Sequence, residues 1–124
     1  MNIPQSLKYT KEHEWVREDG DTVTVGITDH AQGELGDIIF VEFPEIGQKI
    51  ERDDPFGTIE AVKTVADLFA PISGTVIEIN ETLDDSPESV NNDPYGDGWM
   101  VKVSVSEPGE LDNLMSKDQY LEMF

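Results

Sequence analysis

Lys63 is the residue whose type and position point most clearly to chemistry in this chain. It lies in the stretch GTIEAVKTVADLFAPISG, residues 57–74, which otherwise reads as two apolar strand segments. A lysine between two paired strands projects from a hairpin tip, with its amine in water and its backbone held in place. Such an amine suits covalent modification, because a modifying enzyme needs an accessible nucleophile on an ordered turn. The neighbouring Val62 and Thr64 are β-branched and stiff at χ1, which favours order.

The simpler interpretation of such a lysine is a solvated turn residue or a charged gatekeeper at a sheet edge. The composition makes this cation conspicuous, because the chain has 8 Lys and Arg against 27 Asp and Glu, a net charge of −19. A field of that sign repels nucleic acids and anionic membranes and attracts basic protein surfaces. We therefore expect protein partners and no binding to nucleic acid or membrane.

Other kinds of site have little support. The absence of cysteine excludes disulfides, thiolate nucleophiles and Cys-ligated metals. His13 and His30 have no second histidine at helical spacing, which disfavours a His-based metal site. Residues 91–98 resemble a calcium loop in composition but lack its ligand spacing and terminal Glu. The sequence contains neither a phosphate-binding glycine loop nor a Gly-x-Ser-x-Gly nucleophile elbow.

The length and the apolar runs indicate the class of protein. A chain of 124 residues is the size of one domain, 1–124, with one core. Apolar runs such as 37–41 fall far short of the roughly 20 residues that span a bilayer. The first residues resemble neither a signal peptide nor a transit peptide, so we expect a bacterial-type cytoplasm. We also expect a monomer.

Short strands must position Lys63. Alternating β-branched residues around an Asp-Gly turn predict a hairpin. This hairpin covers 15–27, and further strands are predicted at 37–43, 49–51, 57–62, 64–69, 75–79 and 99–105.

Helices are predicted to be short. Asp29 and Gln32 have the spacing of a capping box, which predicts a helix over 28–36. Residues 81–98 are rich in turn formers and predict a surface excursion with one helical turn. Residues 108–124 predict a C-terminal helical segment. The pattern favours an all-β, mainly antiparallel sandwich or barrel with short helices.

The segment around Lys63 resembles the attachment motif of lipoyl domains, with Glu60 three positions before the lysine. Gly47 and Gly74 lie 16 residues before and 11 after it, as they do in that family. A wider resemblance runs over about 7–121. Five segments, in order, resemble those of the H proteins of the glycine cleavage system: YTKEHEWV from residue 9, VGITDHAQ from 25, LGDI from 35, APISG from 70 and NDPYGDGW from 92.

This resemblance implies a barrel-sandwich hybrid fold with a lipoyl hairpin at about 57–70 and lipoate joined by an amide to Lys63. It implies a carrier subunit without catalytic activity of its own. Its partners would be a pyridoxal-phosphate glycine decarboxylase, a tetrahydrofolate-dependent aminomethyltransferase and dihydrolipoamide dehydrogenase. The carrier would move the aminomethyl group of glycine between the first two and electrons to the third. A lipoate-attaching enzyme would recognise Glu60.

The resemblance also implies a surface cleft for the loaded arm beside the His-Glu-Trp stretch. Glu14 and Asp67 are the acidic residues that correspond to partners of the cationic aminomethyl amine. Glu34 either joins this acidic pocket or faces solvent.

Three alternatives remain at this point. The same attachment motif permits an H-like carrier that serves lipoate relay or sulfur metabolism. A biotin carrier fits less well, because that hairpin prefers methionine on both sides of the lysine, where this chain has Val62 and Thr64. The third alternative is an acidic β-sandwich interaction module that carries no modification.

Overall fold

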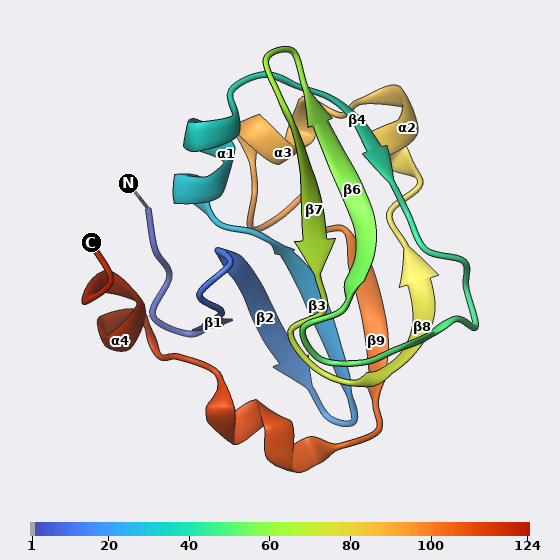
Figure 1. Ribbon diagram of the computed structural model, residues 1–124, viewed down its shortest axis with the longest axis vertical. Coiled ribbons are helices and arrows are strands. Elements are labelled where there is room, and N and C mark those ends of the chain that lie inside the picture. The colour runs from blue at the N-terminus through green and yellow to red at the C-terminus, as the bar shows by residue number, and fades with distance from the viewer. Residues whose placement is uncertain (1) are drawn as a thin grey trace.

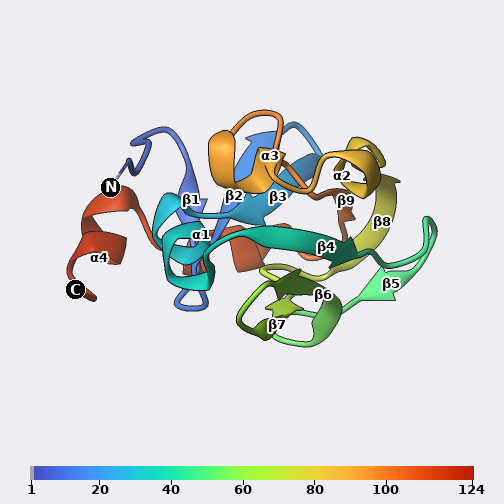
Figure 2. The same cartoon turned by 90° about the horizontal axis from the view of Figure 1, so that it is seen from above.

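The computed structural model describes residues 2–124, which form two antiparallel β-sheets with short helices at their margins (Figure 1). One sheet has the order β1-β2-β3-β9-β8-β5, and the other has the order β4-β6-β7. Figure 2 shows β6 and β7 on one side of the molecule and β2, β3 and β9 on the other. The all-β prediction is confirmed. The strands are β1 (Lys8–Tyr9), β2 (Glu14–Asp19), β3 (Thr22–Ile27), β4 (Ile38–Glu42), β5 (Lys49–Ile50), β6 (Pro55–Ala61), β7 (Val65–Phe69), β8 (Gly74–Ile79) and β9 (Val101–Val105).

The helices differ from the predicted ones in detail. The turn-rich region holds two helices instead of one turn, and the C-terminal region forms a 3₁₀ helix followed by a short α-helix. None of the helices within residues 2–124 is long and apolar enough to cross a membrane. The helices are α1 (Asp29–Leu35), α2 (Thr82–Asp85), α3 (Ser89–Asn92), η1 (Pro108–Asn113) and α4 (Lys117–Leu121).

Helix α1 begins one residue earlier than the predicted capping box implies. Thr28 is its N-cap, and the Thr28 hydroxyl accepts a hydrogen bond from the Ala31 amide at 3.2 Å. The Asp29 carboxylate instead accepts a hydrogen bond from the Gln32 side chain at 2.8 Å. The prediction was wrong about the cap because threonine and aspartate both cap helices well, and spacing alone does not choose between neighbours.

The core lies between the two sheets and consists of inward-facing Val, Ile and Leu side chains. A second cluster surrounds Trp15, which is fully buried together with Tyr9 and Tyr120. A Cβ on Gly26 would lie 2.7 Å from the Trp15 ring, so this position in β3 requires glycine. The Trp15 indole donates a hydrogen bond to the Pro94 carbonyl at 2.9 Å, which ties the loop after α3 to the six-stranded sheet.

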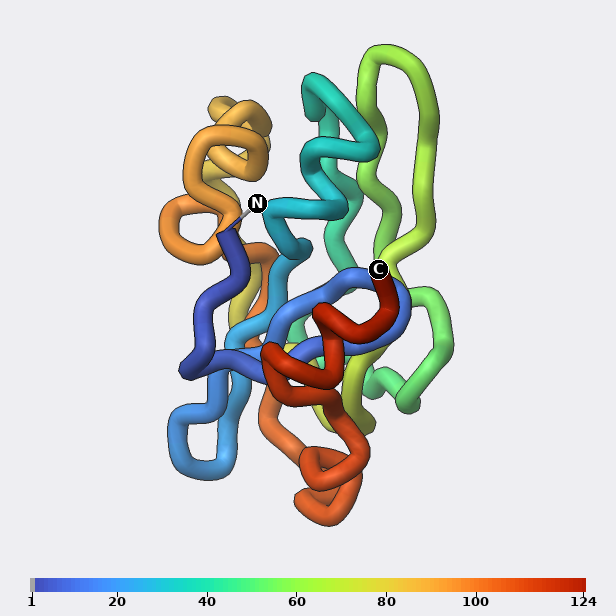
Figure 3. Tube along the Cα trace, turned by 90° about the vertical axis from the view of Figure 1, so that its left-hand side faces the viewer, coloured from blue at the N-terminus to red at the C-terminus, as the bar shows by residue number. Residues whose placement is uncertain are grey.

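The predicted hairpin around Lys63 is formed by β6 and β7, which pair with Glu60 opposite Val65. Two glycines allow neighbouring strands to come close. A Cβ on Gly57 would lie 2.5 Å from the Glu42 carbonyl oxygen in β4, and a Cβ on Gly74 would lie 2.2 Å from that of Ser104 in β9. The strands around the hairpin are therefore closely packed. Figures 1 and 3 show the hairpin tip at one end of the molecule beside α1.

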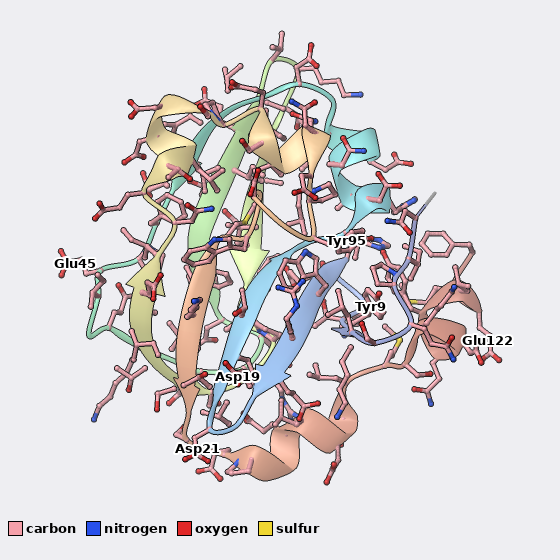
Figure 4. The ribbon with its side chains drawn as sticks, turned by 180° about the vertical axis from the view of Figure 1, so that it is seen from behind. Tyr9, Asp19, Asp21, Glu45, Tyr95 and Glu122 are labelled. Atoms are coloured by element: carbon pink, nitrogen blue, oxygen red, sulfur yellow. The ribbon has the colours of Figure 1, made fainter. Side chains whose placement is uncertain are left out.

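The negative charge is distributed around the molecule. In Figure 4, Glu45 and Glu122 lie at opposite margins, and Asp19 and Asp21 lie near one end. These four carboxylates are exposed. Exposed carboxylates therefore occur at separate margins of the molecule (Figure 4).

Candidate functional site

Lys63 is exposed at the tip of the β6–β7 hairpin, in the connection formed by residues 62–64. The Ala61 amide donates a hydrogen bond to the Thr64 carbonyl at 2.8 Å, which closes the turn. The Val62 amide donates to the Asp37 carbonyl at 3.0 Å, which ties the tip to the segment between α1 and β4. The amine is thus accessible while the backbone beneath it is held.

The Lys63 stem lies over Gly36, the residue that ends α1. A Cβ on Gly36 would lie 3.4 Å from Lys63 Cε and 3.8 Å from Nζ. Gly36 has φ of +79°, a conformation that favours glycine. The C-terminal end of a helix carries a partial negative charge, which favours an unmodified ammonium nearby. The stem therefore leaves the hairpin on the side of α1.

Asn91 is a positioning residue that sequence reasoning missed. Its side-chain amide donates to the Gly36 carbonyl at 2.8 Å and to Gln32 Oε1 at 3.0 Å, and its Oδ1 accepts from the Ile38 amide at 2.9 Å. These bonds join the end of α1 to the start of β4, the segment that holds the hairpin tip. The sequence carried no signal for this role, because Asn91 lies in a stretch where asparagine is expected as a turn former.

A cleft of about 520 Å³, which we call the arm cleft, runs between α1 and β7. Leu35, which is next to Gly36, is part of its wall, so the cleft begins near the Lys63 stem. It brings together Glu14, Asp67 and Glu34, whereas Glu60 is exposed on β6 and does not line it. The remaining wall residues are Glu12, His13, Ile27, His30, Ala31, Ile59, Ala66, Leu68 and Phe69.

Glu14 is the buried acid of this cleft, with 2% of its surface exposed. Its Oε1 accepts a hydrogen bond from the Thr10 hydroxyl at 2.7 Å, and its Oε2 accepts one from the Phe69 amide at 3.1 Å. Burial raises the pKa of Glu14 to about 8, although both hydrogen bonds act in the opposite direction. At neutral pH most molecules therefore hold a neutral carboxyl group here, and a cation placed beside it would favour the carboxylate.

His13 and His30 of the cleft wall pack against aromatic side chains of the C-terminal segment. His13 Nδ1 and the Tyr120 hydroxyl form a hydrogen bond of 2.7 Å, and that hydroxyl also bonds Thr28 Oγ1 at 2.9 Å. The His13 and His30 ring centroids are 4.7 Å apart, and the Phe124 ring centroid is 4.5 Å from that of His30. Burial, together with the neighbouring His30, lowers the pKa of His13. Figure 3 shows the C-terminal segment beside the loop before β2.

Comparison with known proteins identifies the family. The family model described as "Glycine cleavage H-protein" matches residues 7–124. The chain belongs to the glycine cleavage H-protein family. The glycine cleavage system H protein of Staphylococcus carnosus is 60% identical and covers 99% of this chain and 98% of its own length. That of Geobacillus kaustophilus is 57% identical, covering 97% and 94%. A crystal structure of a Mycobacterium marinum H protein superposes with a TM-score of 0.87 at 38% identity, covering 98% of both chains.

The resemblance seen in the sequence is thereby confirmed. Members of this family are lipoate-carrying subunits of the glycine cleavage system and are not catalysts themselves, and this chain shares that carrier role. Its geometry agrees with such a cofactor. An exposed amine lies on an ordered tip, and the adjoining cleft has an apolar wall that includes Ala31, Leu35 and Leu68, which fits the hydrocarbon chain of a lipoyl group.

Proposed function

We propose that lipoate is attached to this carrier by an amide at Lys63. The observation that supports the proposal is the position of the amine, exposed on a hydrogen-bonded turn with its stem over Gly36 at the end of α1. A lipoate-attaching enzyme would supply the lipoyl group as an acyl adenylate or acyl thioester. The neutral Lys63 nitrogen attacks the carbonyl carbon, the bond to the leaving group breaks, and the nitrogen loses one proton.

The partners in this proposal are those of the glycine cleavage cycle: the pyridoxal-phosphate glycine decarboxylase, the tetrahydrofolate-dependent aminomethyltransferase and dihydrolipoamide dehydrogenase. Lipoate supplies a dithiolane that is reduced, carries the aminomethyl group of glycine and is reoxidised. The chain contributes a tether, which raises the effective concentration of the arm at each docked partner. We place this exchange in the cytoplasm, in keeping with the bacterial relatives, and propose that the carrier is a monomer.

Glu14 and Asp67 are proposed to hold the cationic amine of the loaded arm in the cleft. A cation beside Glu14 lowers the pKa of this carboxyl, so that the group loses its proton and pairs with the ligand. Glu34 has a side chain that is 73% exposed, with a carboxylate oxygen 3.9 Å from His30 Nε2. We assign Glu34 to the rim of the cleft, where solvent weakens any contact with the amine.

Peptide mapping of the parent and of Lys63→Arg tests the attachment site. After expression with lipoate and an attaching enzyme, the parent should carry one lipoyl amide, at Lys63. Lys63→Arg retains the charge but not the reactive amine, so it should unfold at the parent's denaturant midpoint and carry none. Lys49→Arg, at an exposed residue of β5 in the other sheet, is the matched control and should be modified like the parent. Lipoate on Lys49 or Lys102 with an unmodified Lys63 would overturn the proposal.

A further inference from the structure

Strand β4 presents two consecutive apolar side chains to solvent. It pairs with β6 through Ile38 opposite Ala61 and then Phe40 opposite Glu60, so Ile39 is an extra, bulged residue. Ile38 is buried, whereas Ile39 and Phe40 are 49% and 46% exposed. A regular strand alternates its side chains between the two faces, and a bulge changes their direction. In a regular strand only one of Ile39 and Phe40 would face solvent, whereas the bulge exposes both.

This apolar surface continues across the three-stranded sheet toward Lys63. Glu60 pairs with Phe40 on one side and with Val65 on the other, which places these three residues in one row across β4, β6 and β7. Val65 is 61% exposed, and Val62, the neighbour of Lys63, is 72% exposed. We call Ile39, Phe40, Glu60, Val62 and Val65 the outer patch.

The surroundings of the outer patch are acidic. Asp37 and Glu42 flank its β4 residues, and Asp67, which also lines the arm cleft, lies two residues after Val65 in β7. All three are exposed. Lys63 is the cation beside it, and acylation would remove this charge. A surface that complements the patch therefore has an apolar centre and basic groups around it. None of the five patch residues lines the arm cleft.

We propose that the outer patch is the docking surface for the enzyme that attaches lipoate, an inference that rests on the proposed attachment at Lys63. The position of the Lys63 amine favours this enzyme as the partner that binds the patch. The attaching enzyme must bring its acyl donor to the amine itself, so its active-site rim covers the surface next to the hairpin tip. The lipoyl-lysine arm separates the dithiolane from the hairpin tip. An enzyme that acts on the dithiolane therefore does not need to contact the patch.

The double variant Phe40→Ser/Val65→Thr tests this docking surface. Calorimetry should show that the unmodified variant binds a purified lipoate-attaching enzyme at least about tenfold more weakly than the parent, as for truncation of an interface anchor. Lipoylation followed by intact mass should slow by a similar factor at low carrier concentration. Ile77→Ser, which removes an exposed apolar side chain from β8, is the matched control and should bind like the parent. Phe40→Leu should retain most of the affinity.

Two further measurements separate the explanations. Acetylation of Lys63 by a small activated ester should proceed equally in the parent and the double variant, which shows that the amine itself is unchanged. Unaltered enzyme binding by the double variant, with the parent lipoylated at Lys63, overturns the docking surface and leaves the proposed function intact. A parent that is never lipoylated at Lys63 overturns both. A parent that sediments as a dimer, with a monomeric double variant, assigns the patch to a second copy and also overturns the docking proposal.

Discussion

Glu14→Gln isolates the effect of burying one carboxyl group in the arm cleft. Glutamine has nearly the same shape as the protonated glutamic acid and does not titrate. Its amide oxygen can accept the hydrogen bond from the Phe69 amide, and its amide nitrogen can donate to the Thr10 hydroxyl, which rotates to suit. The variant is therefore expected to fold and to resemble the neutral form of the parent.

The pH dependence follows from the pKa of about 8 in the folded protein against an ordinary value of 4.5. Between these values the folded state binds one more proton than the unfolded state, so the free energy of unfolding falls as the pH rises. The stabilisation is fully present below pH 4.5 and is lost as the pH rises through 8. The slope is about 1.4 kcal/mol per pH unit, and the total is on the order of 5 kcal/mol.

Urea unfolding of the unlipoylated parent and variant between pH 5 and 9 measures this effect. The unfolding free energy of Glu14→Gln minus that of the parent should increase by about 1.4 kcal/mol per pH unit up to about pH 8 and then level off. Glu122→Gln removes one exposed carboxylate and corrects for the change in net charge. A difference that stays constant from pH 5 to 8 would refute the reasoning, because it would mean that Glu14 ionises in the folded cleft as it does in the unfolded chain.

Three other predictions concern Glu60 in the hairpin, the Tyr120 hydroxyl group and the net charge. Glu60→Ala should change the unfolding free energy by no more than about 0.5 kcal/mol, as exposed substitutions do, and should slow lipoylation in an intact-mass time course; an unchanged rate would leave Glu60 as a solvated strand residue. Tyr120→Phe leaves Thr28 and His13 without their hydroxyl partner and should cost about 1–3 kcal/mol in urea unfolding; no loss would show that other groups or water satisfy them. Raising salt from 0.1 to 1 M shortens the Debye length from about 10 to about 3 Å and should raise the apparent KM of the partner enzymes for the lipoylated carrier more than it lowers kcat. A KM that does not change with salt would limit the net charge of −19, or −20 after acylation of Lys63, to a role in solubility.

The sequence was most informative where structure depends on neighbouring residues. Alternation of β-branched and polar residues placed the strands on either side of Lys63, and the turn between them needed no distant contact. The helix predicted over 28–36 ends at Gly36, whose positive φ suits a residue that follows a helix. The family motifs are also local. Residues 9–16 and 70–74 are short contiguous segments that can be recognised without knowledge of the fold.

Contacts between distant segments were decided by the tertiary structure alone. His13 and Tyr120 are 107 positions apart and meet only because α4 packs beside β1. Asn91 joins α1 to β4 from the short helix α3, in a turn-rich stretch where an asparagine has many other possible roles.

The sequence by itself determined which groups the site contains: an amine between two strands and acids at positions 14, 60 and 67. The fold decided the environment of these acids. It buries Glu14 against β7 and leaves Glu60 exposed on β6. Ionisation depends on the medium around a carboxyl group, and that medium is assembled from segments far apart in the chain. The same reason applies to the outer patch, whose bulge at Ile39 exists only in the pairing of β4 with β6.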